Sequence, residues 1–447
     1  MKQREGFSSG LTVFLVTLSS AVGLGNIWLF PYLTGSNGGA AFILIYLSCI
    51  AIVGLPVMLC EFFMGRRTKK NIIGAVTTLS NKKAFKSIGY LGMASTAMIA
   101  FFYAVVAGWV YSYVLKSITG TFKGVNNTEV KEIFTSHTTS IFPPVIWILI
   151  VLTVVAIILI SGVKKGIEKV AKVLMPILLI LLVICAVKSL TLSGAKEGIN
   201  FLIKPDFSKV NMAVVVSALG LSFFKLSLGM GTMTTYASYY TKDSNLYGNA
   251  AKVIISDTLV SLLAGLAIFP AVFSFGLDPS SGPSLLFETI PLIFSKIPGG
   301  SILIVAFFLT AAFASTMALI SMIEVLVAYF TEEKKIDRTK AVIAIVSVVF
   351  IVSAITSMTV SGGVLSKYPL FDTFDKLTSS ILLPLGGLII AIFIGWFVNK
   401  KDFLDELSNE GALKQNVTAA KVSHIIIKFV TPILLIIVFL SSIGVIW

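Results

Sequence analysis

Two stretches of this sequence, SSAVGLGNIW at residues 19–28 and KLSLGMGT at residues 225–232, place glycines inside long apolar runs. Glycine allows a helix to unwind, and unwound backbone at membrane depth is tolerated only where it is buried in protein or lines a cavity. Two such breaks at corresponding positions of two halves are typical of inverted-repeat transporters, whose sites lie at the breaks. The alternative is two ordinary membrane helices that contain glycine. The second stretch also carries Lys225, an ammonium that needs an interior partner at this depth.

The composition is that of a polytopic membrane protein. Of 447 residues, 56% are hydrophobic and 13% charged, and the mean hydropathy is +0.96, whereas soluble proteins carry about 25% charged residues. About eleven runs are long enough to cross a bilayer as helices. They are 11–34, 40–64, 88–116, 142–161, 168–190, 212–240, 250–276, 302–330, 341–358, 376–398 and 424–446. We expect an all-α membrane protein with a single domain, residues 1–447.

The net charge of +14 is explained by membrane topology. With the N-terminus inside, most Lys and Arg fall in loops on the same side, as the positive-inside rule requires. These loops are 66–86, 164–172, 242–252, 334–340 and 400–421. We therefore expect a multi-pass protein of the plasma membrane with a cytoplasmic N-terminus and the lipid bilayer, not nucleic acid, as its partner. Residues 284–300 are apolar but interrupted by prolines, and we expect a short helical external loop there.

Six motifs together resemble the neurotransmitter:sodium symporter family, which has the LeuT-like fold. They are SSAVGLGNIWLFPYLTGSNGGAAF (19–42), PVMLCEFFMGR (56–66), TYASYYTKD (235–243), LLAGLAIFPAVFSFG (262–276), ISMIEVLVAYFTEE (320–333) and LFDTFDKLTSSILLPLGG (370–387). The resemblance covers nearly the whole chain and is to an eleven-span, bacterial-type member. It implies a 5+5 inverted repeat, about 8–190 and 210–398, with unwound helices 1 and 6 and an extra C-terminal helix at about 424–446. It also implies alternating access, with spans 1, 2, 6 and 7 rocking against the rest.

The resemblance further implies an amino-acid site between spans 1, 3, 6 and 8. Tyr103 would donate its hydroxyl to the substrate carboxylate, helped by backbone N–H groups near Leu24 and Gly25. The lining is mostly apolar, which favours a neutral, hydrophobic amino acid. The residues that match the family's pocket are Ser20, Ala21, Leu24, Gly25, Ile99, Tyr103, Phe224, Lys225, Ser227, Met230, Ala318 and Met322.

The gates carry over in part. Arg4, Glu332 and Tyr239 match the cytoplasmic gate of the family, although an isolated Arg4 could also be a simple positive-inside anchor. The external gate pairs an arginine of span 1 with an acid of span 10. Here the arginine position is Leu29 while the acid remains as Asp375, so this gate is not the usual salt bridge.

The first sodium site is altered at two ligands. The family places a sodium there among a span 1 carbonyl at Ala21, the side chain of Asn26, a hydroxyl of span 6 and an asparagine of span 7. Here the hydroxyl position is Lys225 and the asparagine position is Asp257. The two changes together replace a sodium ion by a tethered ammonium and its counter-ion.

The second sodium site also lacks oxygen ligands. Its span 8 hydroxyl positions are Met317 and Ala318, with only a carbonyl from Ala314, and a thioether or a methyl does not serve a hard cation. An alignment shifted by three residues would restore Ser315 and Thr316. The family's chloride site keeps Tyr46 and Ser261 but has Leu221 in place of its glutamine.

We therefore expect an amino-acid transporter, a monomer or weak homo-oligomer, without a tightly bound sodium, metal or other cofactor. A second carboxylate arriving beside the Lys225–Asp257 pair favours proton uptake, which gives proton coupling. If the pair is permanently charged, the protein is an exchanger or uniporter. The alternatives are a conventional sodium-coupled symporter and a transport-dead amino-acid sensor. Enzyme motifs with a metal-binding His-Glu-x-x-His or a nucleophile elbow are absent from the sequence.

Overall fold

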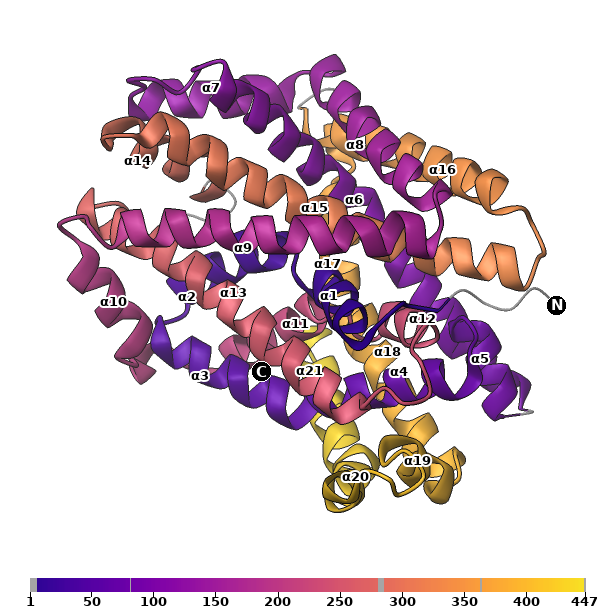
Figure 1. Cartoon of the computed structure of the whole chain (residues 1–447). Helices are drawn as coiled ribbons and strands as arrows, with labels where there is room; N and C mark the ends of the chain where they lie inside the picture. Colours follow the sequence, from indigo (N-terminus) through magenta and orange to yellow (C-terminus); the bar gives the residue numbers. More distant parts are fainter. Residues whose placement is uncertain (1–5, 81, 280–284, 362–363, 446–447) are drawn as a thin grey trace.

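The computed structural model describes residues 6–80, 82–279, 285–361 and 364–445, and the regular structure in these ranges is helical apart from one isolated bridge between Gly39 and Pro205. Figure 1 shows the helices gathered into one bundle. Nine continuous helices of the described residues are long and apolar enough to cross a membrane, and a bent pair makes a tenth. The eleventh expected span, 212–240, is a pair of shorter helices.

The first half of the chain forms spans 1 to 5. Two connecting helices, α7 and α5, lie outside the expected spans. The bounds are α1 Gly10–Ala21, η1 Gly25–Leu29, α2 Phe30–Ser36, α3 Ala40–Cys49, η2 Ile50–Gly54, α4 Leu55–Thr68, α5 Ile72–Leu79, η3 Lys83–Phe85, α6 Lys86–Ile118, α7 Asn127–Thr139, α8 Phe142–Ile160, η4 Val163–Glu168 and α9 Lys169–Ser189.

The second half forms spans 6 to 11. Between spans 7 and 8 the described part of 284–300 holds two short helices, η6 and α14, as expected for that loop. The bounds are α10 Ala195–Ile203, η5 Phe207–Lys209, α11 Met212–Lys225, α12 Thr232–Ala237, α13 Leu246–Ser274, η6 Leu285–Thr289, α14 Ile290–Lys296, α15 Gly300–Glu332, α16 Arg338–Val360, η7 Val364–Lys367, α17 Leu370–Lys376, η8 Leu377–Leu382, α18 Leu383–Ile392, η9 Phe393–Phe397, α19 Lys400–Leu407, α20 Lys414–Ile425, η10 Ile426–Val430 and α21 Thr431–Ser442.

Span 11 begins earlier than the sequence predicts. The helix starts at Lys414 instead of residue 424. Its first turns consist largely of polar residues, so the apolar run in the sequence begins later than the helix. Ahead of it, the charged segment after span 10 forms the short helix α19.

Both predicted breaks are present. Span 1 is interrupted between Ala21 and Gly25, and the helices on either side are bent by 57°. Span 6 is interrupted between Lys225 and Thr232, at the glycines quoted above. In both spans the backbone N–H and C=O groups at the breaks are freed from helical bonding and are available to side chains or a ligand.

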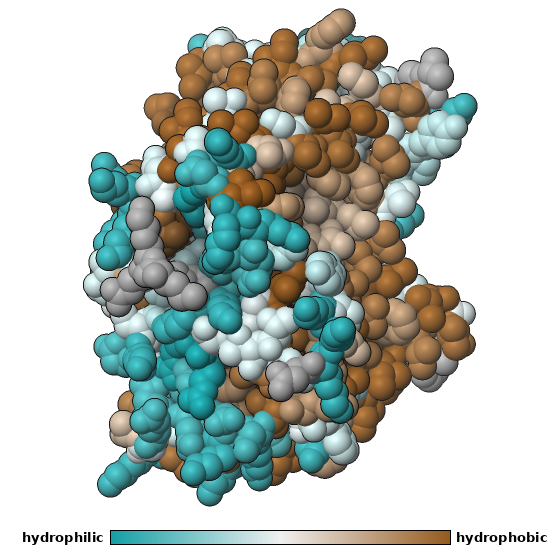
Figure 2. Space-filling model, turned by 90° about the vertical axis from the view of Figure 1, so that its right-hand side faces the viewer, coloured by the Kyte–Doolittle hydropathy of each residue, from teal (hydrophilic) through white to brown (hydrophobic). Residues whose placement is uncertain are grey.

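The core lies around α6 and α15, which pack along each other. In the most apolar stretch of each helix, 72% of α6 and 78% of α15 are buried inside the protein, but only 28% of the last span. Spans 3 and 8 are therefore central and span 11 is peripheral. Figure 2 shows one end of the bundle, where hydrophilic residues cover much of the face beside a broad hydrophobic surface.

Candidate functional site at the two helix breaks

Lys225, the last residue of α11, has its ammonium enclosed by polar and aromatic groups. Its Nζ lies 3.0 Å from Asp257 Oδ2, 2.7 Å from the Tyr46 hydroxyl and 2.5 Å from Ser261 Oγ. The rings of Phe30 and Tyr46 lie with centroids 5.0 Å and 4.7 Å away. Both side chains of the Lys225–Asp257 salt bridge are 0% exposed. An ammonium has three N–H donors, and three acceptors surround this one.

Asp257 also binds span 1. Asn26 Nδ2 donates to Asp257 Oδ1 at 2.6 Å and to the Asp257 carbonyl at 3.1 Å. The same nitrogen lies 3.0 Å from Ser261 Oγ, and the Asn26 side-chain oxygen accepts from the Gly23 N–H. Asn26, Lys225 and Asp257, predicted as the replacement of a cation site, therefore form one buried network that joins spans 1, 6 and 7.

The unwound part of span 6 is shaped by left-handed backbone. Ser227, Gly229 and Gly231 have φ values of 51°, 75° and 80°, a region that glycine adopts without strain and other residues rarely adopt. Glu61 of α4 accepts the Gly229 N–H at 2.8 Å and the N–H and hydroxyl of Thr234 at 3.2 Å. This carboxylate thus satisfies backbone donors that the break leaves without helical partners.

Ser227 connects the two breaks. Its hydroxyl donates to the carbonyl of Ser20 at 2.8 Å. Gly25 lies directly against span 6, because a Cβ built on it would be 3.0 Å from Lys225 Cγ and 3.4 Å from a Phe224 ring carbon. The residues at the breaks are therefore packed against one another, as the sequence predicts.

Tyr103 reaches the break of span 1 from α6. Its hydroxyl accepts the Leu24 N–H at 2.9 Å, which leaves the hydroxyl proton free for another acceptor. A Cβ built on Gly23 would lie 2.9 Å from that hydroxyl and 3.3 Å from the Cβ of Ala318 on α15. Spans 1, 3 and 8 therefore meet here.

The remaining lining residues follow helical spacing. Ile99 precedes Tyr103 by four residues on α6, and Met322 follows Ala318 by four on α15, so each pair shares a face. Met230 is buried with its carbonyl accepting from the Thr96 hydroxyl at 2.8 Å. All the predicted substrate-binding residues are buried except Phe224, which is half-buried.

The span 8 positions that match the family's second sodium site, Met317 and Ala318, carry no side-chain oxygen. Ala318, not Ser315 or Thr316, is the α15 side chain beside Gly23. The Ser315 hydroxyl donates to the Ala312 carbonyl of its own helix, and the Thr316 hydroxyl bonds with the Tyr111 hydroxyl of α6 at 2.6 Å. This geometry supports the unshifted alignment.

The gate residues are placed in part. Arg4 lies outside the described residues. Glu332 accepts the backbone N–H and the side-chain N–H of Asn71 at 3.0 and 2.9 Å. Asp375 is half-buried on α17 and forms no salt bridge within the described part of the chain. The roles of these residues in gating stay predictions.

Glu324 and Arg338 are two functional candidates that the sequence reasoning missed, and Glu324 contacts Tyr239, which was predicted as part of the cytoplasmic gate. Tyr239 donates to Glu324 at 2.8 Å, and Arg338 binds both oxygens of Glu324 at 3.1 and 2.6 Å. Arg338 also donates to the Leu159 carbonyl at 2.8 Å. Glu324 is fully buried in α15. Its place as an acid inside an apolar run was the available signal.

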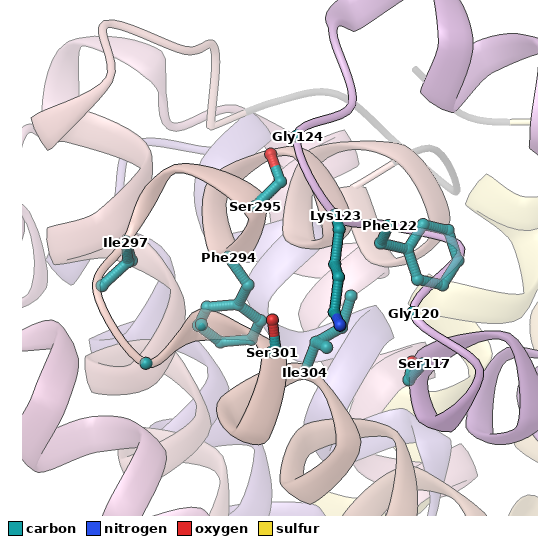
Figure 3. A pocket seen from close by; sticks show the side chains of 12 residues that line it. Ser117, Gly120, Phe122, Lys123, Gly124, Phe294, Ser295, Ile297, Ser301 and Ile304 are labelled. Atoms are coloured by element: carbon teal, nitrogen blue, oxygen red, sulfur yellow. The ribbon is translucent and has the colours of Figure 1, made fainter.

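A separate polar cavity of about 150 Å³ lies where the end of α6 meets α14 and the start of α15. Figure 3 shows the Lys123 side chain running into it between Phe122 and Phe294. It shares no residue with the network around Lys225, so we do not assign the site to it.

The family of the chain follows from comparison with known proteins. The family model described as "Sodium:neurotransmitter symporter family" matches residues 4–133 and 136–446. The chain belongs to this family. It is 35% identical over 98% of both chains to the uncharacterized sodium-dependent transporter YhdH of Bacillus subtilis, and 34% identical to an uncharacterized sodium-dependent transporter of Haemophilus influenzae, over 99% of this chain and 98% of that protein.

A solved relative confirms the fold. The structure of MhsT in complex with L-phenylalanine superposes with a TM-score of 0.91 at 41% identity, covering 98% of this chain and 100% of that chain. The all-α, LeuT-like architecture expected from the sequence is thereby confirmed. As a member of the symporter family, the protein is a multi-span membrane transporter.

Proposed function

We propose that this protein is a secondary transporter of neutral, hydrophobic amino acids that works by alternating access without sodium at its first cation site. We place it in the plasma membrane with the N-terminus in the cytoplasm. MhsT was solved with L-phenylalanine, and this chain's corresponding lining of Ile99, Phe224, Met230 and Met322 is apolar. Beside the break of span 1, the Tyr103 hydroxyl accepts the Leu24 N–H, and its own proton is available to a substrate carboxylate.

One observation supports transport without sodium. The ammonium of Lys225 lies in a buried site with Asp257, Tyr46 and Ser261 around it. A sodium ion in the same place would lose these oxygens to the ammonium and would be repelled by its charge. Because Lys225 and Asp257 neutralise each other, the site needs no dissolved cation for charge balance.

Two modes of coupling are compatible with this site. If Asp257 or Lys225 exchanges a proton when the substrate carboxylate arrives, uptake carries protons inward. If the pair stays charged throughout, the protein equilibrates or exchanges its substrate. A conventional sodium-coupled symporter is the second candidate, which the names of the bacterial relatives favour.

The proposal is tested by uptake of L-phenylalanine into liposomes. The liposomes contain the purified protein and a pH-sensitive dye. We expect uptake in sodium-free buffer. Internal acidification with uptake assigns proton coupling, and uptake without acidification assigns exchange or uniport. Uptake that needs sodium overturns the proposal in favour of the conventional symporter. Substrate binding without any counterflow exchange identifies a sensor instead of a transporter.

A further inference from the structure

An apolar groove of about 450 Å³ opens on the side of the bundle between α3 with η2, α11 and α21. Its volume is within the range of about 300–1,000 Å³ that is typical of small-molecule sites. The walls are aliphatic and aromatic, with Ser48 and Cys49 as the few more polar members. Leu44, Ile52 and Phe207 on its rim are 48%, 42% and 58% exposed, so the groove is open to the surrounding hydrocarbon.

The groove shares two of its walls with the Lys225 network. On α3, Cys49 lines the groove and Tyr46, one turn earlier, binds the Lys225 ammonium. On η2, Val53 lines the groove, and a Cβ built on the next residue, Gly54, would lie 3.3 Å from Leu226 at the start of the unwound segment. An occupant of the groove therefore contacts α3, which carries Tyr46, and α11, which carries Lys225.

Positive charge lies at one end of the groove. Phe207 belongs to η5, which ends at the exposed Lys209 just before α11 begins, and Lys204 is exposed nearby in sequence. The one acid between them, Asp206, accepts the Ser208 N–H at 3.0 Å and the Ser208 hydroxyl at 2.6 Å. This end of the groove thus combines an apolar channel with lysine side chains at the edge of a membrane span.

We propose that the groove binds one acyl chain of an anionic glycerophospholipid, whose phosphate pairs with Lys209, and that this lipid supports the packing of α11 on α3. Bilayer hydrocarbon is as apolar as the groove, so transfer from the bilayer gives no hydrophobic gain. Selectivity must come from close packing of the chain and from the attraction between lysine and an anionic headgroup. That requirement selects an anionic phospholipid over a zwitterionic one.

Photo-crosslinking tests the proposal on the full-length protein in nanodiscs. The probes are phosphatidylglycerol and phosphatidylcholine, each with a diazirine in one acyl chain, and crosslinked peptides are identified by mass spectrometry. We expect enrichment in 44–53, 212–219 and 434–438 with phosphatidylglycerol over phosphatidylcholine. Lys209→Gln should reduce this preference about fivefold, the change that corresponds to about 1 kcal/mol per basic side chain near anionic lipid.

The matched variants fill two different grooves. Ser48→Trp fills the proposed site at an exposed position, and Ala344→Trp fills a second apolar groove between α6, α15 and α16. Crosslinks at the first groove should disappear in Ser48→Trp alone. Equal labelling of both grooves in the wild-type protein, or labelling that Ser48→Trp leaves unchanged, overturns the proposal.

If Ser48→Trp does not fold, competition by unlabelled phosphatidylglycerol in the wild-type protein decides. Loss of labelling in the groove before labelling elsewhere is lost supports the site. Uniform loss of labelling contradicts it.

Discussion

At the scale of single residues, we propose that the Lys225 ammonium takes the place of the ion that the family resemblance assigns to this site. A dissolved ion can leave such a site, whereas this ammonium is attached to α11 and forms an ion pair with Asp257. Its ammonium also takes the Tyr46 and Ser261 hydroxyls as acceptors, the two groups that survive from the family's chloride site. Under this proposal, one ammonium serves in place of the sodium and also binds two residues that match the chloride site.

The Lys225–Asp257 pair should show strong coupling in a double-mutant cycle. Lys225→Thr and Asp257→Asn each leave one buried charge without its partner, which costs about 3–5 kcal/mol. The double variant removes both charges and should recover much of that loss. Thermal unfolding of the three purified variants measures the coupling, and losses that simply add would contradict a direct pair.

Tyr103→Phe should weaken substrate binding about 10- to 100-fold, because a hydrogen bond to a charged group contributes about 1.5–3 kcal/mol. Tyr111→Phe is the matched control. It removes a hydroxyl from the same helix that bonds to Thr316 and not to the helix break. Isothermal titration with L-phenylalanine compares the two. An equal effect of both changes would argue against a carboxylate contact of Tyr103.

At the scale of elements, the break in span 6 depends on close backbone approach as well as on left-handed φ. A Cβ on Gly229 would lie 2.4 Å from the Leu383 carbonyl oxygen of α18. Gly299 has a similar φ, 80° against 75°, but nothing lies within 4 Å of its Cβ position. The two glycines thus separate the cost of conformation from the cost of contact.

Gly299→Ala should cost about 1–2 kcal/mol from the left-handed backbone alone. Gly229→Ala should cost about 1–3 kcal/mol more because α18 must move away. Thermal unfolding of both variants is the measurement. Equal destabilisation of both variants would show that the contact between Gly229 and α18 adds no cost of its own.

The short helix α19 is fastened to the end of span 2. Arg66, which is 4% exposed, donates to Glu406 Oε1 at 2.5 Å and to Asn409 Oδ1 at 2.8 Å, and also to the carbonyls of Ser244 and Glu406. The adjacent Arg67, whose side chain is 38% exposed, pairs with Asp402 at 3.0 Å and more weakly with the second oxygen of Glu406 at 3.5 Å. The Arg66 guanidinium therefore joins span 2 to the loop after span 6 and to the connection after span 10.

Arg66→Gln should destabilise the protein by about 3 kcal/mol and accelerate hydrogen exchange in residues 399–413, since it removes the nearer of the two arginines that pair with the mostly buried Glu406. Arg67→Gln should cost less than about 1 kcal/mol, because its pair is exposed to solvent. Exchange measured by mass spectrometry on both variants distinguishes them. Similar protection in both would indicate that α19 is held by its apolar face instead.

At the scale of the whole molecule, the apolar runs and the two glycine motifs were enough to predict most of the spans and both helix breaks. The partner of Lys225 was predictable because two charges of opposite sign replace two neutral residues. Polar helices such as α7 and α19 left no apolar signal. The Glu324–Arg338 pair joins α15 to the start of α16, and only the turn between these helices brings the two side chains together.

The central claim is that a tethered ammonium replaces the first sodium. The direct measurement is L-phenylalanine uptake by the wild-type protein and by the Lys225→Thr/Asp257→Asn double variant, in identical liposomes with sodium or choline. We predict equal uptake by the wild-type protein in both salts and sodium-stimulated uptake by the double variant. A wild-type protein that transports only with sodium would contradict the account.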